Sequence, residues 1–293
     1  MSAVRVVGAF VGLTGLVVLA ALASLTAQTK IVPPKNSYQP REDVELGKKA
    51  AADTEKEMPV LHDEIATAYV RGVGARLTPT IPEEFRHPEF EYTFKVVDVK
   101  DINAFALPGG PMYVHRGIIE AAATEGELAG VMAHEMSHVA LRHGTAQMTK
   151  AKKGSLFAIL GAAAGAVVGG TAGTAIYQGS QLGVGAVFLR YSRDDEKQAD
   201  LLGVQMMARA GYDPRELAHM FETIEKAGGG QPPQWLSDHP NPGNRVEYIQ
   251  EEASYLTIEN PVGATPDLDN VHAHLKTLPP ARTLAEIEKQ KRR

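Results

Sequence analysis

His134-Glu135-Met136-Ser137-His138, an HExxH motif, is the stretch of sequence that decides the fold. On an α-helix, residues four apart lie on one face, so the two imidazoles converge on one point and Glu135 lies beside it. Thr124-Glu125-Gly126-Glu127 upstream matches a helix-starting capping box, with Thr124 accepting from a free N–H and Glu127 bonding back. The sequence therefore predicts a long helix that begins near Thr124 and runs to about Lys150.

Two histidines at this spacing, with a glutamate between them, are typical of a catalytic zinc site. Such a site needs a third protein ligand and an open position for water, whose pKa the ion lowers to about 7. The chain contains no cysteine, so the third ligand has to be His, Asp or Glu. We therefore expect His134 and His138 to bind one Zn²⁺ per chain and Glu135 to activate the attacking water.

The third ligand has to come from elsewhere in the chain. A histidine six residues after His138, the metzincin arrangement, is excluded because Gly144 occupies that position. Glu196 and Asp200 lie one turn apart on a second predicted helix, so Glu196 can bind zinc while Asp200 accepts from the other N–H of a ligand histidine. Asp194 and Asp195 compete with Glu196, and a solvated acidic face is the alternative interpretation.

The N-terminus carries a targeting signal. Arg5 precedes an uncharged, mostly apolar run from Val6 to Ala27, and Ala21-Leu22-Ala23 matches a small-residue cleavage site. Residues 1–29 are expected to be a cleaved signal peptide or a membrane anchor, followed by a proline-containing linker over 30–41. Either alternative implies an exported protein, periplasmic or membrane-associated through its N-terminus, with its catalytic domain outside the cytoplasm.

The remaining pattern predicts an α+β fold, mainly helical, with a small β-sheet beside the HExxH helix. Alternating residues predict strands over 90–99, 102–107 and 112–115, with a turn at Pro108-Gly109-Gly110-Pro111. Helical periodicity and cap signals predict helices over 43–57, 61–77, 192–210, 214–227 and 245–255. We place the catalytic domain at 42–258 and expect residues 259–293 to form a polar, mobile tail.

Residues 154–189 are uncharged and include nine glycines. This segment is interpreted either as a lid beside the active site or as an Ala/Gly-rich helix packed closely on its neighbours. A membrane hairpin, and with it a membrane-embedded protease, is the third alternative, disfavoured because so many glycines weaken a spanning helix.

Four motifs, in this order, resemble the HtpX and CAAX prenyl protease family of zinc peptidases, in particular its exported bacterial members. The resemblance covers about residues 40 to 255 and rests on Asn103 to Gly110, His134 to Gly144, Glu196 to Asp200, and Asp238-His239-Pro240 with Arg245. It implies a zincin-like metallopeptidase of the gluzincin type, with Glu196 as the third zinc ligand.

The resemblance also places His239 and Arg245 at the active site, where either would steady the oxyanion. His239 has a second interpretation, as a reversible fourth ligand that keeps the site latent. His143 matches the family motif but would lie off the ligand face of a continuous helix, so we expect it to be structural.

The same resemblance implies that Asn103, Ala104 and Phe105 belong to an edge strand that binds substrate as an added strand. Backbone pairing reads little sequence, so the expected partners are unfolded or misfolded proteins, as in envelope quality control. A chaperone-like or scaffold protein with a latent or structural zinc site is the alternative, disfavoured because such a site needs no base at Glu135. The net charge of -5, without a basic stripe, argues against a nucleic-acid partner.

Overall fold

The computed structural model describes residues 28–152, 191–227, 234–239, 244–263 and 267–291. The described residues from Ile31 to Lys291 form one unit by their contacts. The expectations for the leader over 1–27 and for the glycine-rich segment over 154–189 concern residues outside these described ranges. Among the helices of the described ranges, none is both long and apolar enough to cross a bilayer.

Within the described residues, a mixed sheet of three strands lies at the centre, in the order β1-β3-β2. β1 (Thr93–Val97) runs parallel to β3 (Pro111–His115), and β2 (Ala104–Ala106) runs antiparallel to β3. Gly109 and Gly110 make the turn between β2 and β3 with φ of 83° and 121°, values that favour glycine. All three predicted strands are confirmed, although β1 and β2 are shorter than expected, and β2 lies at an edge of the sheet that the described residues form.

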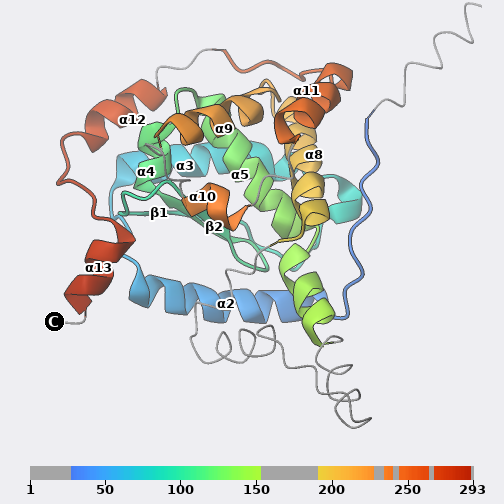
Figure 1. Ribbon diagram of the computed structural model, residues 1–293, viewed down its shortest axis with the longest axis horizontal. Coiled ribbons are helices and arrows are strands. Elements are labelled where there is room, and N and C mark those ends of the chain that lie inside the picture. Colours follow the sequence, from blue (N-terminus) through green and yellow to red (C-terminus); the bar gives the residue numbers. More distant parts are fainter. Residues whose placement is uncertain (1–27, 153–190, 228–233, 240–243, 264–266, 292–293) are drawn as a thin grey trace, which may run out of the picture. The chain divides into compact units, whose positions relative to one another are not determined.

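Successive strand residues point to opposite faces of the sheet. Both faces are buried, each against a different core. On one side Val96, Met112 and Val114 join the main core, which the HExxH helix also enters. On the other side Phe105 and Tyr113 form a smaller core with residues of α2 (Pro40–Glu57) and α13 (Leu284–Lys291). Figure 1 shows α2 running beneath the sheet, on the side opposite α5. The expected mainly helical α+β fold is confirmed.

The HExxH helix, α5 (Glu125–Ala140), is surrounded by α8 (Arg193–Arg209) and α9 (Glu216–Ala227). These helices approach closely because glycines lie at the contacts. A Cβ on Gly130 would lie 2.9 Å from the Cα of Leu217 in α9, and one on Gly203 would lie 3.2 Å from the backbone nitrogen of His134. The close contact at Gly203 brings α8 against the metal-binding motif. The other described helices are α3 (Glu64–Leu77), η1 (Thr78–Thr80), η2 (Glu83–Phe85), α4 (Arg116–Ala121), α10 (Gln234–Asp238), α11 (Arg245–Tyr255) and α12 (Asp267–Leu275).

The predicted single helix to Lys150 is wrong, because α5 ends at Ala140 and the chain resumes a helical course only at His143. Arg142 between them has φ of 57°, the left-handed region that a non-glycine residue rarely adopts. Its guanidinium donates to Asp43 at 2.6 Å and to the carbonyl oxygen of Tyr38 at 2.7 Å. These contacts, with Asp43 in α2 and with Tyr38 just before it, stabilise the conformation of Arg142 in which α5 ends.

The start of α5 differs from the predicted capping box by one position. Thr124 accepts from the backbone N–H of Glu127 at 3.1 Å, as predicted. The carboxylate of Glu127, however, accepts from the N–H of Ala123 at 2.7 Å, one residue before the cap.

The expected mobile tail is wrong for residues 267–291, which form α12 and α13. Leu268, Val271 and Leu275 lie on one face of α12 and enter the main core. Arg116 donates to the carbonyl oxygens of Leu275 and Pro279 at 2.6 and 2.8 Å. Three apolar residues at helical spacing carry this docking, although polar residues surround them in the sequence.

Candidate metal centre

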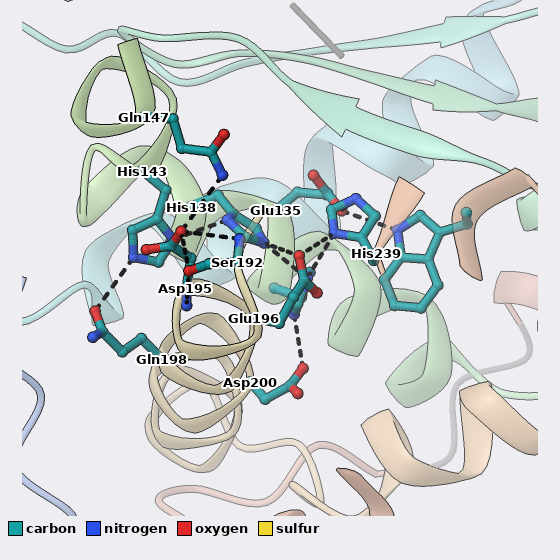
Figure 2. Close-up of polar contacts among 12 residues, drawn as sticks. Glu135, His138, His143, Gln147, Ser192, Asp195, Glu196, Gln198, Asp200 and His239 are labelled. Atoms are coloured by element: carbon teal, nitrogen blue, oxygen red, sulfur yellow. Dashed lines mark hydrogen bonds and ion pairs between the residues drawn. The ribbon is translucent and has the colours of Figure 1, made fainter. Parts of the chain in front are cut away.

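Four buried side chains converge beside α5: His134, His138, Glu196 and His239 each offer one donor atom, and these atoms all lie within 4.8 Å of one another. Figure 2 shows Glu196 reaching this point from α8, and His239 from just after α10. The Nε2 atoms of His134 and His138 are 3.0 Å apart. Glu196 lies 3.4 Å from the first and 3.5 Å from the second. The structure thus brings together three predicted ligands and one candidate fourth.

The acidic residues before Glu196 point elsewhere. Asp194 is exposed. Asp195 is the partner in the capping box of α8, where its carboxylate accepts from the Ser192 hydroxyl at 2.6 Å. Glu196 is thus the residue of the three that faces α5. One turn later, Asp200 accepts from Nδ1 of His134 at 2.8 Å, the position expected for a residue that orients a ligand.

The donor set fits a divalent cation. Nδ1 of His134 donates to Asp200, so in the neutral ring the lone pair is on Nε2, which faces His138 and the Glu196 carboxylate. Imidazole nitrogens with one carboxylate are a donor set that suits zinc.

The pKa values of the ligand side chains are shifted by burial and by the charges of their neighbours. Burial lowers the pKa of His134, but hydrogen bonds with Asp200 and Glu196 outweigh it and raise this pKa to about 9. Burial would raise the pKa of Glu196, yet the neighbouring His239 and His134 hold it far below its usual range. Burial lowers the pKa of His138 well below 6.5, against the opposing effect of Glu196. Glu196 and Asp200 thus stabilise one positive charge in the cluster, on the ring of His134.

Glu135, the expected base, lies at the edge of the cluster. Its Oε1 accepts from the indole Nε1–H of Trp235 at 2.9 Å and lies 3.3 Å from Nε2 of His239. Trp235 is fully buried and stacks on His239 with ring centroids 5.1 Å apart. The sequence analysis missed Trp235, although it is the one tryptophan of the chain and lies four residues before His239.

His239 lies within the ligand cluster. Its Nδ1 is 3.2 Å from Nε2 of His134 and 3.1 Å from Oε1 of Glu196. A donor to an oxyanion would face the substrate, whereas this nitrogen faces the ligand atoms. The geometry favours the fourth-ligand interpretation of the two.

Arg245 lies behind the ligands. Its guanidinium donates to Asp200 at 2.7 and 2.8 Å and to Glu196 at 3.0 Å. Tyr248 donates to Asp200 as well. Because Arg245 is buried with its charge directed at these two carboxylates, the geometry favours a role in holding Glu196 and Asp200 over the predicted contact with an oxyanion.

The three predicted substrate-binding residues are buried in β2 or beside it. The Phe105 ring packs away from the metal cluster, stacked on Tyr113 with centroids 5.2 Å apart. Asn103 donates to the carboxylate of Asp238 at 3.3 Å, and the carbonyl oxygen of Ile102 accepts from the N–H of Trp235 at 3.3 Å. Their side chains are therefore engaged within the protein, so an added strand would have to pair with the backbone of β2 and not with these side chains.

His143 lies closer to the cluster than the sequence suggested. The expectation that it points away assumed a continuous helix, and the break at Arg142 invalidates that assumption. Its Nδ1 lies 2.9 Å from Nδ1 of His138.

Comparison with known proteins places the site in a family. The model of peptidase family M48 matches residues 64–253. The beta-barrel assembly-enhancing protease of Escherichia coli K12 is 28% identical over 203 residues, which are 68% of this chain and 41% of that protein. Metalloprotease LoiP of the same organism is 31% identical over 161 residues, 55% of this chain and 62% of that protein. The mitochondrial metalloendopeptidase OMA1 of Arabidopsis thaliana is 32% identical over 181 residues, 58% of this chain and 34% of that protein.

The match spans less than two thirds of the length of each of these relatives. The region that the family model covers contains the HExxH motif, Glu196, Asp200, His239 and Arg245. The expected resemblance to this group of metallopeptidases is therefore confirmed, and the chain belongs to peptidase family M48.

Proposed function

We propose that the chain is a zinc-dependent endopeptidase that hydrolyses peptide bonds in unfolded or misassembled proteins. The observation that carries this proposal is the position of Glu135, whose carboxylate lies 3.3 Å from His239, a member of the cluster with His134, His138 and Glu196. A structural or scaffold site, the alternative, has no use for a base at that place.

The residues divide the chemistry between them. A divalent ion held by His134, His138 and Glu196 would supply Lewis acidity toward the scissile carbonyl and the attacking water. Glu135 accepts a proton from that water and passes it to the leaving amine. Asp200 keeps the Nδ1 proton on His134, so that its Nε2 lone pair faces the ion. Arg245 holds both carboxylates in place.

The backbone edge of β2 supports the proposed substrate class. An extended peptide that pairs with this edge would be held by its main chain, which is free only in unfolded segments. The names of the relatives, a protease in beta-barrel assembly among them, support a role in envelope quality control for an exported, periplasmic or membrane-anchored protein.

The segment 234–239 supports a latent resting form. Trp235 bonds the base, His239 lies among the ligands, and Asp238 accepts from Asn103 beside the proposed substrate edge. On this proposal the segment has to move before a peptide reaches the metal.

The test is zinc content and casein hydrolysis of the purified protein, wild type beside Glu135→Gln. We expect the variant to bind as much zinc as the wild type and to lose hydrolysis, because the amide cannot accept the proton. Glu127→Gln makes the same change at another buried glutamate of α5 and should keep hydrolysis. Hydrolysis of casein by Glu135→Gln at the wild-type rate would refute the mechanism.

A further inference from the structure

His143 forms a short relay between the second proposed ligand and α8. It is fully buried, with its Nδ1 2.9 Å from Nδ1 of His138 and its Nε2 3.4 Å from Oε1 of Gln198. Figure 2 shows the His143 ring between His138 and Gln198, on the side of His138 away from Glu196. This contact plays no part in the proposed mechanism.

The relay defines which nitrogens carry protons. The amide oxygen of Gln198 only accepts, so Nε2 of His143 carries the proton and its Nδ1 has a lone pair. That lone pair requires the proton on Nδ1 of His138. Nε2 of His138 is then left with its lone pair directed at the cluster, where His134 and Glu196 lie.

We propose that His143 is a positioning residue, which fixes the tautomer and the ring orientation of His138 for metal binding. This proposal rests on the metal site of the proposed function. Tyr191 supports it from a second direction, since its ring stacks on His138 at 3.8 Å between centroids and 20° between planes. The two histidine ligands are thus oriented differently, His134 by a carboxylate and His138 by a neutral relay.

The turn at Arg142 is what makes the relay geometrically feasible. Had α5 continued, a residue five positions after His138 would lie about 140° around the helix from it. The left-handed conformation of Arg142 redirects the chain and returns His143 to His138. Asp43 and the Tyr38 carbonyl hold Arg142 there, and Asn36 donates to its carbonyl oxygen at 3.4 Å. An unfavourable backbone conformation stabilised from three sides is consistent with a required position for His143.

The experiment compares His143→Leu with His143→Asn in the full protein. Zinc affinity is measured by competition with a chelator, and ligand geometry by the visible absorption of the cobalt-substituted protein. His143→Leu should lower zinc affinity roughly 10- to 100-fold, the usual effect of losing a partner that orients a ligand, and should alter the cobalt spectrum. His143→Asn should recover most of the affinity, because its amide oxygen can accept from Nδ1–H of His138.

His115→Leu is the matched control. His115 is another fully buried histidine, with its Nδ1 on the carbonyl oxygen of Asp101. This variant should unfold more easily and keep the zinc affinity and cobalt spectrum of the wild type. Wild-type affinity and spectrum in His143→Leu would overturn the proposal, and so would an Asn variant that loses as much affinity as the Leu variant.

Gln198→Glu tests the direction of the relay. A carboxylate only accepts, so the stated tautomers predict zinc affinity equal to or above that of the wild type. Weaker binding would show that residue 198 has to donate, which overturns the assigned tautomers. A wild type that binds zinc but does not cleave casein would refute the proposed function and leave these comparisons intact, whereas a wild type that binds no zinc would refute both.

Discussion

At the scale of single residues, His239 and Trp235 share one oxygen of Glu135. Both side chains come from the segment 234–239, and both lie within hydrogen-bonding or ion-pair distance of Oε1. These contacts occupy the carboxylate oxygen that would take the proton of the attacking water. The segment therefore restrains the base as well as approaching the metal ligands.

His239→Ala should raise casein turnover. In the fourth-ligand interpretation the substitution opens a position at the metal, whereas a donor to the oxyanion would make turnover fall, typically by about 100-fold or more. The measurement is kcat together with zinc content. Trp235→Phe is the companion variant, since it removes only the indole hydrogen bond to Glu135, keeps an aromatic ring and leaves His239 in place. A drop in kcat at full zinc content in His239→Ala would establish the oxyanion role instead.

The free energy of unfolding depends on pH in part through His115. Burial lowers its pKa from 6.5 to about 4, despite the bond with Asp101. Below pH 6.5 the unfolded chain therefore binds a proton that the folded chain excludes, so this contribution to stability is lost as the pH falls toward 4. The full shift corresponds to about 3 kcal/mol. His115→Asn should show a smaller loss of unfolding free energy between pH 7 and pH 5, measured in urea. Equal losses in both proteins would contradict the assignment.

At the scale of elements, the close packing of α5 against α8 and α9 positions the side chains of the metal site. These helices are so close that a Cβ on Gly130 would lie 2.9 Å from the Cα of Leu217, and one on Gly203 would lie 3.2 Å from the backbone nitrogen of His134. Glu196 reaches the histidines of α5 because α8 packs against α5 at this distance.

Gly130→Ala should therefore destabilise the protein, by roughly 1 to 3 kcal/mol, since its methyl group would lie 2.9 Å from the Leu217 Cα and the backbone would have to shift. Gly72→Ala, in the middle of α3, is the matched control because nothing lies within 4 Å of its added Cβ. Helix propensity predicts that this control is neutral or stabilising by up to about 1 kcal/mol. Thermal and urea unfolding compare the two, and equal effects would show that the close packing at Gly130 is not limiting.

The elements also show what a sequence can and cannot predict here. Helical spacing placed His134 and His138 on one face, the family resemblance implied Glu196 as the third ligand, and the structure has all three at a common point. The end of α5 could not be predicted, because it depends on Arg142 meeting Asp43, 99 residues earlier in the chain. The approach of Trp235 to Glu135 spans 100 residues and follows no local period. Local pattern thus gave the elements and the motif, whereas contacts between distant segments set the break, the relay and the occupied base.

At the scale of the whole molecule, the C-terminal helices are part of the folded unit. α12 contributes three buried residues to the main core, and α13 contributes Ile287 to the core beneath the sheet. The backbone N–H of Lys100 donates to the carbonyl oxygen of Arg282 at 2.9 Å. This bond joins the segment before α13 to the region just after β1.

A chain that ends at Gly263 should accordingly be less stable than the full chain, by roughly 2 to 5 kcal/mol from the lost apolar burial. A chain that ends at Lys291 keeps both helices and is the control. Urea unfolding followed by circular dichroism measures both, and a single cooperative transition is expected for the control. Unchanged stability after removal of both helices would show that they dock without contributing to the fold.

Strand β2 is only three residues long. A guest peptide that pairs with it gains a few backbone hydrogen bonds, each worth about 0.5–1.5 kcal/mol. That gain is too small to extract a segment from a neighbour whose fold is stable by about 5–15 kcal/mol. On the proposed function, such a neighbour would be cut only as often as it opens by itself. The lifetime of each target would then be set by its own fluctuations, and a protein that has finished folding would be spared without having been recognised.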